Sequence, residues 1–300
     1  MERTIFASVE LRAKIGEACK IKHFPWGDKS CKFSGCEITS CFYGYPLKII
    51  FPSSVTDGCC QWLYPIIFGG GLVEGDNINL SLDIGKNCCI LVATLSFPKV
   101  YCCEMGCVSQ QHVKYTVEPE ALLCILPDPL VCYKQAVYNQ TQTFHLTIDS
   151  NLVLLDWFTS GRYSRGEQWL FSRLKSISSI YINEGLAFKE AQNLQNTPFV
   201  TIHRAMKSYN IFGICMIIGY LMEPLWSTIL SNLSNWRNYG EKPKVHSLFA
   251  VSPLYLEGAS KPHGCIIRFS SESVSEAVKR IEEFLGPLFV IIGGNPFKNK

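Results

Sequence analysis

Three carboxylates in short turn sequences are the side chains whose type and setting best fit metal chemistry. Asp76 follows a glycine, Asp128 lies between two prolines, and Glu167 follows Gly166. Each of them taken alone is most simply a solvated side chain or the cap of a turn. Weak and exposed oxygen ligands, however, hold a divalent transition-metal ion briefly and then release it. The three carboxylates therefore suit the transfer of a metal ion better than its storage.

Fifteen cysteines are a second group that could bind a metal. The sequence contains no Cys-x-x-Cys, which removes the strongest zinc and redox signal. Neighbours such as Cys88 and Cys89 point to opposite faces of a strand and are poorly placed to bind one ion. We interpret most of the cysteines as small buried residues in a reducing compartment. The cluster Cys102, Cys103 and Cys107 is the one candidate for a soft-metal site.

Motifs of enzymes are weak or missing in the sequence. The glycines at 69–71 and 75 invite a phosphate-loop interpretation, but no Gly-Lys-Ser/Thr follows them and the chain enters an alternating strand. Glycines at positive φ in tight turns explain them better. There is no Gly-x-Ser-x-Gly and no His-Glu-x-x-His. No catalytic residue is therefore assigned, and a hydrolytic enzyme stays open only as a weaker alternative.

The composition limits the class of protein. Of the 300 residues 47% are apolar and 18% are charged, which suits a chain with a large core. The net charge of +3 without a basic run argues against nucleic acid or an anionic membrane as partner. The longest apolar stretch, 211–222, is too short to span a bilayer, and no signal peptide is recognised. We expect a soluble cytoplasmic protein.

Alternating apolar and polar residues predict strands through the first two thirds of the chain. The alternation covers residues 78–84, 113–117 and 143–148, and runs that are apolar apart from Thr94 and Asp156 cover 90–95 and 152–158. A period of two is typical of strands with one buried face, whereas a continuous run predicts a strand buried on both faces. Sequences rich in glycine, proline and aspartate separate the runs. The sequence predicts a mostly β fold.

Two helices are predicted in the C-terminal region. Ser273 and Glu276 form a capping pair before an apolar stripe that ends at Gly286-Pro287. A second stripe begins near Pro224, and its residues at helical spacing are Trp226, Ile229, Leu233 and Trp236. We interpret both stripes as facing the core. Because there is no repeat of fixed period and no clear linker, residues 1–300 are expected to form a single domain.

Several sequence blocks occur in an order and spacing that match one known family. They are Gly69-Gly70-Gly71-x-x-x-Gly75-Asp76, Lys99-Val100-Tyr101, Leu126-Pro127-Asp128-Pro129, Tyr133-x-x-Ala136-x-x-x-Gln140, Asp156-Trp157 with Gly161-Arg162, Gly166-Glu167 and Trp169, and Gly293-Gly294-Asn295-Pro296-Phe297. On these residues the chain resembles the urease accessory proteins of the UreD type, also called UreH. The match is best over residues 68–170.

The resemblance implies a fold, a function and partners. The fold would be mostly β, with strands stacked helically as in a β-helix and two helices in the C-terminal region. The protein would be a non-enzymatic scaffold that helps to insert nickel into apo-urease, in a hetero-oligomer with a UreF-type accessory protein and a UreG-type GTPase. No cofactor would be tightly bound, and Ni²⁺ would pass through transiently. In that family, acidic residues along the nickel path match Asp76 and Glu167, with Asp128 behind them.

The other residues of the blocks are expected to be structural or to form interfaces. They are Gly69, Gly70, Gly71, Gly75, Lys99, Tyr101, Asp156, Gly161, Arg162, Gly166 and Trp169. The chain departs from the family's pattern at Leu95, where a glutamine is usual. It also departs at Cys124, where a glutamate is common, which makes the Cys124 thiolate a further candidate nickel ligand. A β-rich interaction protein unrelated to urease stays open as the main alternative.

Overall fold

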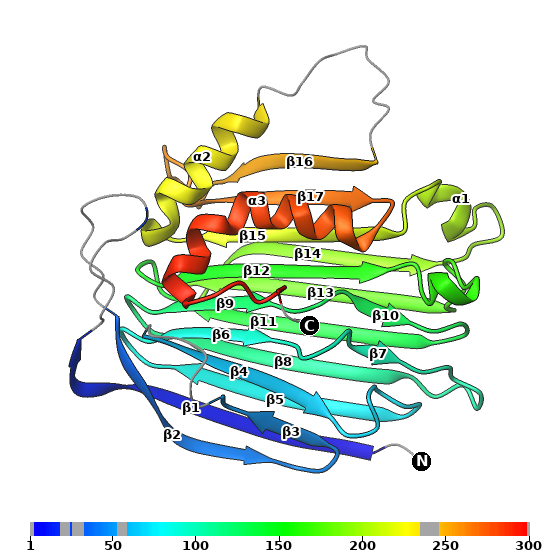
Figure 1. Ribbon diagram of the computed structural model, residues 1–300, viewed down its shortest axis with the longest axis horizontal. Helices are drawn as coiled ribbons and strands as arrows, with labels where there is room; N and C mark the ends of the chain where they lie inside the picture. The colour runs from blue at the N-terminus through cyan, green and yellow to red at the C-terminus, as the bar shows by residue number, and fades with distance from the viewer. Residues whose placement is uncertain (1–2, 19–24, 26–32, 53–58, 235–245, 299–300) are drawn as a thin grey trace.

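The computed structural model describes residues 3–18, 25, 33–52, 59–234 and 246–298. Most of them lie in two large β-sheets, and helices cover one of the two (Figure 1). The strands are β1 (Arg3–Ala18), β2 (Ser34–Tyr43), β3 (Leu47–Ile50), β4 (Cys60–Ile67), β5 (Asp76–Ile84), β6 (Cys89–Ala93), β7 (Lys99–Val100), β8 (Ser109–Val117), β9 (Leu122–Leu126), β10 (Leu130–Cys132), β11 (Val137–Leu146), β12 (Asn151–Thr159), β13 (Arg173–Ile182), β14 (Gly185–Gln195), β15 (Ile211–Ile218), β16 (Ser247–Leu254) and β17 (Gly264–Ser271). The helices are α1 (Ile202–Met206), α2 (Glu223–Ser234) and α3 (Val274–Ile292), with short 3₁₀ turns η1 (Tyr163–Arg165) and η2 (Tyr220–Met222).

The central part of the chain alternates between the two sheets. From β4 to β13 the chain passes back and forth between the ten-stranded and the seven-stranded sheet, with the short strands β7 and β10 inserted before β8 and β11. As a result β5, β8, β11 and β13 stack in parallel on one side, and β4, β6, β9 and β12 stack in parallel on the other. The register between β8 and β11 places residues of similar type beside each other. For example, the rings of Tyr115 and Phe144 stack with centroids 4.8 Å apart. The predicted β-helix-like stacking is confirmed.

The burial of each strand follows its sequence pattern. Along β5 buried and half-buried residues alternate, because one face meets the opposite sheet and the other meets solvent. Every residue of β6 and β9 is buried, since their sheet packs against the seven-stranded sheet on one face and against helices on the other. Cys88 and Cys89 belong to these two separate cores, as the alternation of side chains requires.

Helix α3 begins where the sequence predicts and ends later. The hydroxyl of Ser273 accepts the backbone N–H of Glu276 at 3.2 Å. The predicted end at Gly286-Pro287 is wrong, because the helix continues to Ile292 and stops at Gly293 in the left-handed conformation. The turns after Pro287 bury Leu288, Ile291 and Ile292, which offsets the hydrogen bond that proline cannot make. Figure 1 shows the helix changing direction in this part.

The last third of the chain holds more strand than the sequence analysis predicts. Strands β15, β16 and β17 extend the ten-stranded sheet antiparallel to one another beyond β12. Helix α2 covers this extension, and the predicted helical residue Trp236 lies outside the described residues. In the described part of the chain, none of the helices has the length and apolar character needed to cross a bilayer.

The C-terminal segment returns to the first coils of the solenoid. Helix α3 contacts β4 and β6 as well as β17. The indole N–H of Trp62 in β4 donates to the carbonyl of Ile292 at 2.7 Å. Beyond the helix, the ring of Phe297 meets Trp157 edge-on at 6.3 Å and Phe289 at 6.4 Å between centroids. The end of the chain therefore fastens the helix layer onto strands from its first half.

Candidate functional site

The sequence blocks gather at one end of the solenoid because of its topology. Each loop that leads from the ten-stranded sheet to the seven-stranded sheet emerges at that end, on the right in Figure 1. These loops cover residues 68–75, 94–108, 127–136 and 160–172. They contain most of the residues that carry the family resemblance between 68 and 170, whereas Asp76, Gln140 and Asp156 lie in strands. Segments far apart in sequence thus form one continuous edge, called here the block edge.

The glycine run and Lys99-Tyr101 form one corner of the block edge. The N–H of Leu72 donates to the carbonyl of Lys99 at 2.8 Å, and the N–H of Tyr101 donates back to Leu72 at 2.9 Å. The Tyr101 hydroxyl donates to the carbonyl of Gly69 at 2.8 Å. A Cβ at Gly71 would lie only 2.6 Å from the Lys99 carbonyl oxygen. These residues are structural, and the glycine is required by a close approach of two backbones.

An aromatic and ionic chain continues from this corner along the edge. Tyr101 meets Tyr133 edge-on at 5.2 Å, and the guanidinium of Arg162 lies over the Tyr133 ring at 4.0 Å. Arg162 also forms two hydrogen bonds to the carboxylate of Glu167, whose Oε2 accepts the N–H of Lys134 at 3.2 Å as well. The Arg162 bonds lower the pKa of Glu167. Glu167 is therefore an ionised carboxylate whose oxygens are already used.

Three residues hold the loop that carries Glu167. Gly161 has φ of +125° and a Cβ there would meet the Glu167 carbonyl at 3.2 Å, while Gly166 ends the turn η1 at φ of +75°. Trp169 is buried, and its indole N–H donates to the carbonyl of Tyr209 at 3.0 Å. The loop is thereby bound to the segment before β15.

Asp76 lies at the start of β5 and is almost fully buried. One carboxylate oxygen accepts from Arg3 at 2.7 Å and the other accepts the N–H of Val73 at 3.0 Å. The carboxylate closes the turn after the glycine run and pairs with the first strand. A metal ion at Asp76 would have to displace Arg3.

A cavity lies between the two sheets behind the block edge. Its volume is about 150 Å³, and its lining includes Asp128 and Asp156. The Asp128 carboxylate accepts the Thr94 hydroxyl at 2.9 Å, and the same hydroxyl accepts the Asp128 N–H at 2.7 Å. The Asp156 carboxylate accepts from Ser176 at 2.9 Å and from Gln140 at 3.3 Å. Two carboxylates thus face an interior space that is otherwise largely apolar.

The interior position of Asp156 changes its acidity. Loss of hydration raises the pKa of Asp156, and the hydrogen bonds from Ser176 and Gln140 lower it by less. Burial likewise raises the pKa of Tyr138, whose hydroxyl lies 2.9 Å from Gln111 and 3.0 Å from Gln140. Part of the Asp156 side chain remains accessible because it faces the cavity.

The interior cavity adjoins a second one that reaches the block edge. This outer cavity has a volume of about 130 Å³ and is lined by Gly70, Gly71 and Lys99. Thr94 and Gln111 line both cavities. The two cavities are therefore neighbours, and a route from the block edge to Asp128 and Asp156 would pass these two side chains. Leu95, which stands where the family usually has glutamine, lines the outer cavity.

The candidate ligands from the sequence do not form one cluster. Asp128 faces the cavity, whereas Asp76 and Glu167 lie in separate loops with arginine partners. Cys124 is fully buried on the far side of its sheet, in the core under the helices, and burial raises its pKa. Within the described residues no three His, Cys, Asp or Glu side chains are placed to hold a metal ion, and this includes Cys102, Cys103 and Cys107.

The sequence analysis assigned Asp156 to the structural set and missed the glutamines beside it. The signal was present in β11, where inward positions that should be apolar carry Gln140 and Gln142 between Tyr138 and Phe144. Polar residues in the buried phase of a strand need partners inside the protein. Here these partners are Asp156, Ser176 and Ser178 on neighbouring strands.

The fold and this interior define the chain as a β-solenoid-like protein with carboxylates enclosed between its sheets. Residues 30–297 match the family model described as UreD urease accessory protein. The chain belongs to this family and has a urease accessory role.

Named relatives come from plants, bacteria and fungi. The chain is 30% identical to urease accessory protein D of Arabidopsis thaliana, in a match that covers 86% of this chain and 94% of the relative. It is 27% identical to urease accessory protein UreD of Anaeromyxobacter sp., over 87% and 83% of the two chains. It is 25% identical to urease accessory protein 4 of Cryptococcus neoformans, over 83% and 86%.

Proposed function

We propose that this chain is a non-enzymatic scaffold through which Ni²⁺ reaches apo-urease. The observation that carries the proposal is the cavity between the sheets, with Asp128 and Asp156 facing it and an adjoining outer cavity at the block edge. Carboxylate and amide oxygens are weak ligands for Ni²⁺ and release it readily. The relatives' names place the family with urease, whose maturation is the process that such a path would serve.

The raised pKa of Asp156 suits a transient ligand. Because the pKa of Asp156 is raised, a proton competes for this carboxyl more strongly than in water, and an arriving divalent ion must overcome that competition. Loss of hydration also makes an unpaired carboxylate costly in the interior, so the hydrogen bonds from Ser176 and Gln140 must support it when the ion leaves. Binding is weakened by this competition, which favours passage over storage.

The arginine-bound carboxylates have a different part in this proposal. Asp76 and Glu167 fix the loops on either side of the Lys99 corner, because each bridges an arginine and a backbone N–H. The block edge is then the face toward the partners, for which we propose a UreF-type accessory protein, a UreG-type GTPase and apo-urease. The resulting assembly would be a hetero-oligomer in the cytoplasm.

The test is reconstitution of apo-urease with the two partner types, Ni²⁺ and GTP, with and without this chain. Asp128→Asn and Asp156→Asn keep the size of each side chain and remove its charge. We expect urease activity to require the chain and to fall several-fold in each variant, while the complex still forms. Asp83→Asn, on the outer face of β5, is the matched control and should activate normally.

Two results would contradict the proposal. Activation that does not depend on the chain would remove the delivery role altogether. Full activation by the Asp128→Asn/Asp156→Asn double variant would leave a scaffold role and remove the interior path.

A further inference from the structure

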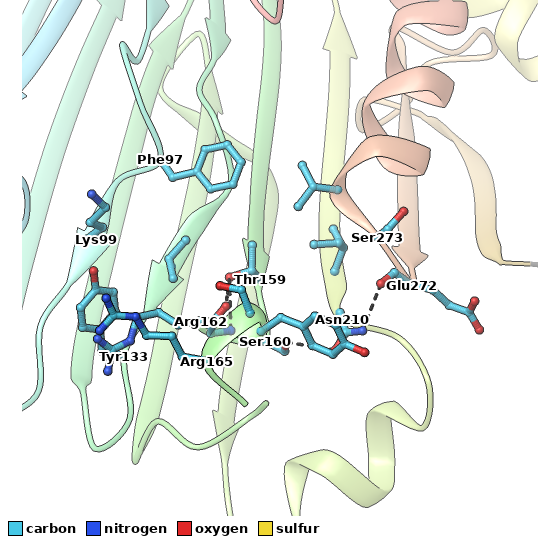
Figure 2. Close-up of a pocket in the computed structure, with 16 residues that line it drawn as sticks. Phe97, Lys99, Tyr133, Thr159, Ser160, Arg162, Arg165, Asn210, Glu272 and Ser273 are labelled. Atoms are coloured by element: carbon cyan, nitrogen blue, oxygen red, sulfur yellow. Dashed lines mark hydrogen bonds between the residues drawn. The ribbon is translucent and has the colours of Figure 1, made fainter. Parts of the chain in front are cut away.

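A surface cleft separate from the interior cavity lies farther along the block edge. Its volume is about 460 Å³. It is formed where β10, β12 and β15 meet the beginning of α3, with Lys99 and Tyr133 on one side and Ser273 on the other (Figure 2). Nothing in the proposed nickel route uses this cleft.

The floor of the cleft is apolar. Val131, Ile211 and Val274 line it from three different elements. Two aromatic side chains at its border are unusually exposed, Phe97 at 38% and Tyr163 at 65%. Apolar side chains that converge on a concave surface are the usual setting for an anchor residue of a partner.

Positive charge surrounds this apolar floor. Lys99 and Arg165 line the cleft, and in the described part of the chain neither forms an ion pair. Arg162 also lines it, but its charge is balanced by Glu167. The acidic side chain in the lining is Glu272, which lies 2.7 Å from Nδ1 of His246. Two cations therefore remain to attract a negatively charged ligand.

The wall that carries these cations is held in place. Arg162 is fixed by Tyr133 and Glu167, and the turn η1 carries Tyr163 and Arg165 directly after it. A prearranged wall loses little freedom on binding, which favours recognition of an extended segment. The cleft holds one or two large side chains rather than a whole helix.

We infer that this cleft binds a segment of a partner protein in which an apolar side chain is flanked by Asp or Glu. The apolar side chain enters the floor between Val131 and Ile211, and the flanking carboxylates meet Lys99 and Arg165. This inference rests on the proposed function, because the partner is a component of the urease assembly. Charge complementarity selects a protein segment of this kind over a neutral or basic one.

The experiment places a photoreactive benzoyl-phenylalanine at Tyr163 in the full chain. The chain is mixed with apo-urease, the accessory partners, Ni²⁺ and GTP, and the cross-linked peptide is identified by mass spectrometry while urease activity is measured in parallel. The matched control places the same group at Phe199, which is 88% exposed and does not line the cleft. The charge test adds Lys99→Glu/Arg165→Glu, with Lys114→Glu/Lys175→Glu on the outer face of the seven-stranded sheet as control.

The expected result is a cross-link from position 163 to an acidic segment with an apolar residue. Reversal of both cleft charges should lower its yield roughly tenfold or more, since each reversal replaces an attraction by a repulsion. The control reversals and the probe at position 199 should not reproduce this pattern.

Other outcomes overturn the inference and separate it from the nickel proposal. A cross-link to a neutral or basic segment, or one that is insensitive to the charge reversal, removes it. The absence of any protein cross-link at position 163, in a mixture that still activates urease, also removes it. Position 163 could cross-link to an acidic segment in a mixture where urease is activated equally well without the chain. That result would support the binding cleft and contradict the nickel-delivery role.

Discussion

At the scale of single residues, Asp156 is the side chain least suited to its surroundings. It is an acid in the interior, supported by one hydroxyl and one amide. Because its pKa is raised in the folded state, the native protein binds a proton at this site more tightly than the unfolded chain does. At neutral pH the ionised carboxylate therefore lowers the free energy of unfolding. Such a residue is expected where its chemistry is used.

Asp156→Asn is predicted to stabilise the protein at pH 7. The amide removes the buried charge and keeps an acceptor for Ser176, so the unfolding midpoint should rise by about 2 °C. The gain should shrink as the pH falls through the folded pKa toward the unfolded value, since the wild-type carboxyl becomes neutral there. Thermal unfolding across a pH series measures both effects. A lower midpoint at pH 7 would mean that the hydrogen bonds to the carboxylate outweigh its desolvation.

At this scale the sequence identifies the carboxylate side chains but not the residues with which they form ion pairs and hydrogen bonds. Asp76 and Glu167 can be recognised from the sequence as carboxylates in turns. The partner of Asp76, however, is Arg3, which lies on β1, far away in sequence. Asp156 is one of the block residues that are expected from the sequence to be structural or to form interfaces. Only the stacking of β11, β12 and β13 shows that it faces Gln140 and Ser176.

At the scale of elements, the corner between the glycine run and β7 is the tightest contact of the block edge. Gly71 lies against the backbone of Lys99, and hydrogen bonds join the two segments in both directions. The same corner borders the outer cavity and the surface cleft through Lys99. A small shift of this corner would therefore change the walls of both the outer cavity and the surface cleft.

Gly71→Ala is predicted to destabilise the protein by about 1–3 kcal/mol, because the added methyl group meets the Lys99 carbonyl and the loops must separate. Gly286→Ala in α3 is the matched control. Its added methyl group meets no atom within 4 Å outside the neighbouring residues. The helix preference of alanine is opposed by crowding from Pro287, so stability should change by less than about 1 kcal/mol. Urea unfolding of both variants measures the difference. Equal stability of the two variants would contradict the close contact at Gly71.

The periodicity of the sequence predicted the elements that have one buried and one solvent-exposed face. It failed for elements whose ends depend on packing against residues far away in sequence. The alternation in β5 and β8 identified both strands, since each has one face in solvent. The end of α3 was placed too early, because Leu288, Ile291 and Ile292 gain enough burial to carry the helix past Pro287. The sequence of β15 is a short run of apolar residues without a clear periodicity. Such a run does not distinguish a buried strand from a buried helix.

At the scale of the whole molecule, the alternation of the chain between two sheets brings the scattered sequence blocks together in the block edge. The family resemblance predicted the stacked β fold, and the structure confirms it. The single domain over residues 1–300 stays a prediction. The layer of α2 and α3 completes the core on one side only, so the outer face of the seven-stranded sheet stays polar and uncovered by these helices.

Phe297→Ala is predicted to loosen this layer and to lower the free energy of unfolding by about 2 kcal/mol. The half-buried ring contacts Trp157 of the sheet and Phe289 of the helix, and both contacts would be lost. The matched control is Phe199→Ala, at a ring that is 88% exposed, which should change stability by less than about 0.5 kcal/mol. Denaturant unfolding followed by tryptophan fluorescence measures both. An unchanged midpoint for Phe297→Ala would show that the C-terminal segment does not hold the helix.

The return of α3 to β4 and β6 also has a consequence for the order of events during synthesis. Strands laid down early in translation have their inner faces covered by the next coils, but their outer faces, with Trp62 and Leu91, must wait for the final helix. That helix is synthesised long after these strands, because all of β8 to β17 come between them. A nascent chain stalled before α3 would therefore present a row of apolar side chains to chaperones, and the emergence of α3 would end that interval.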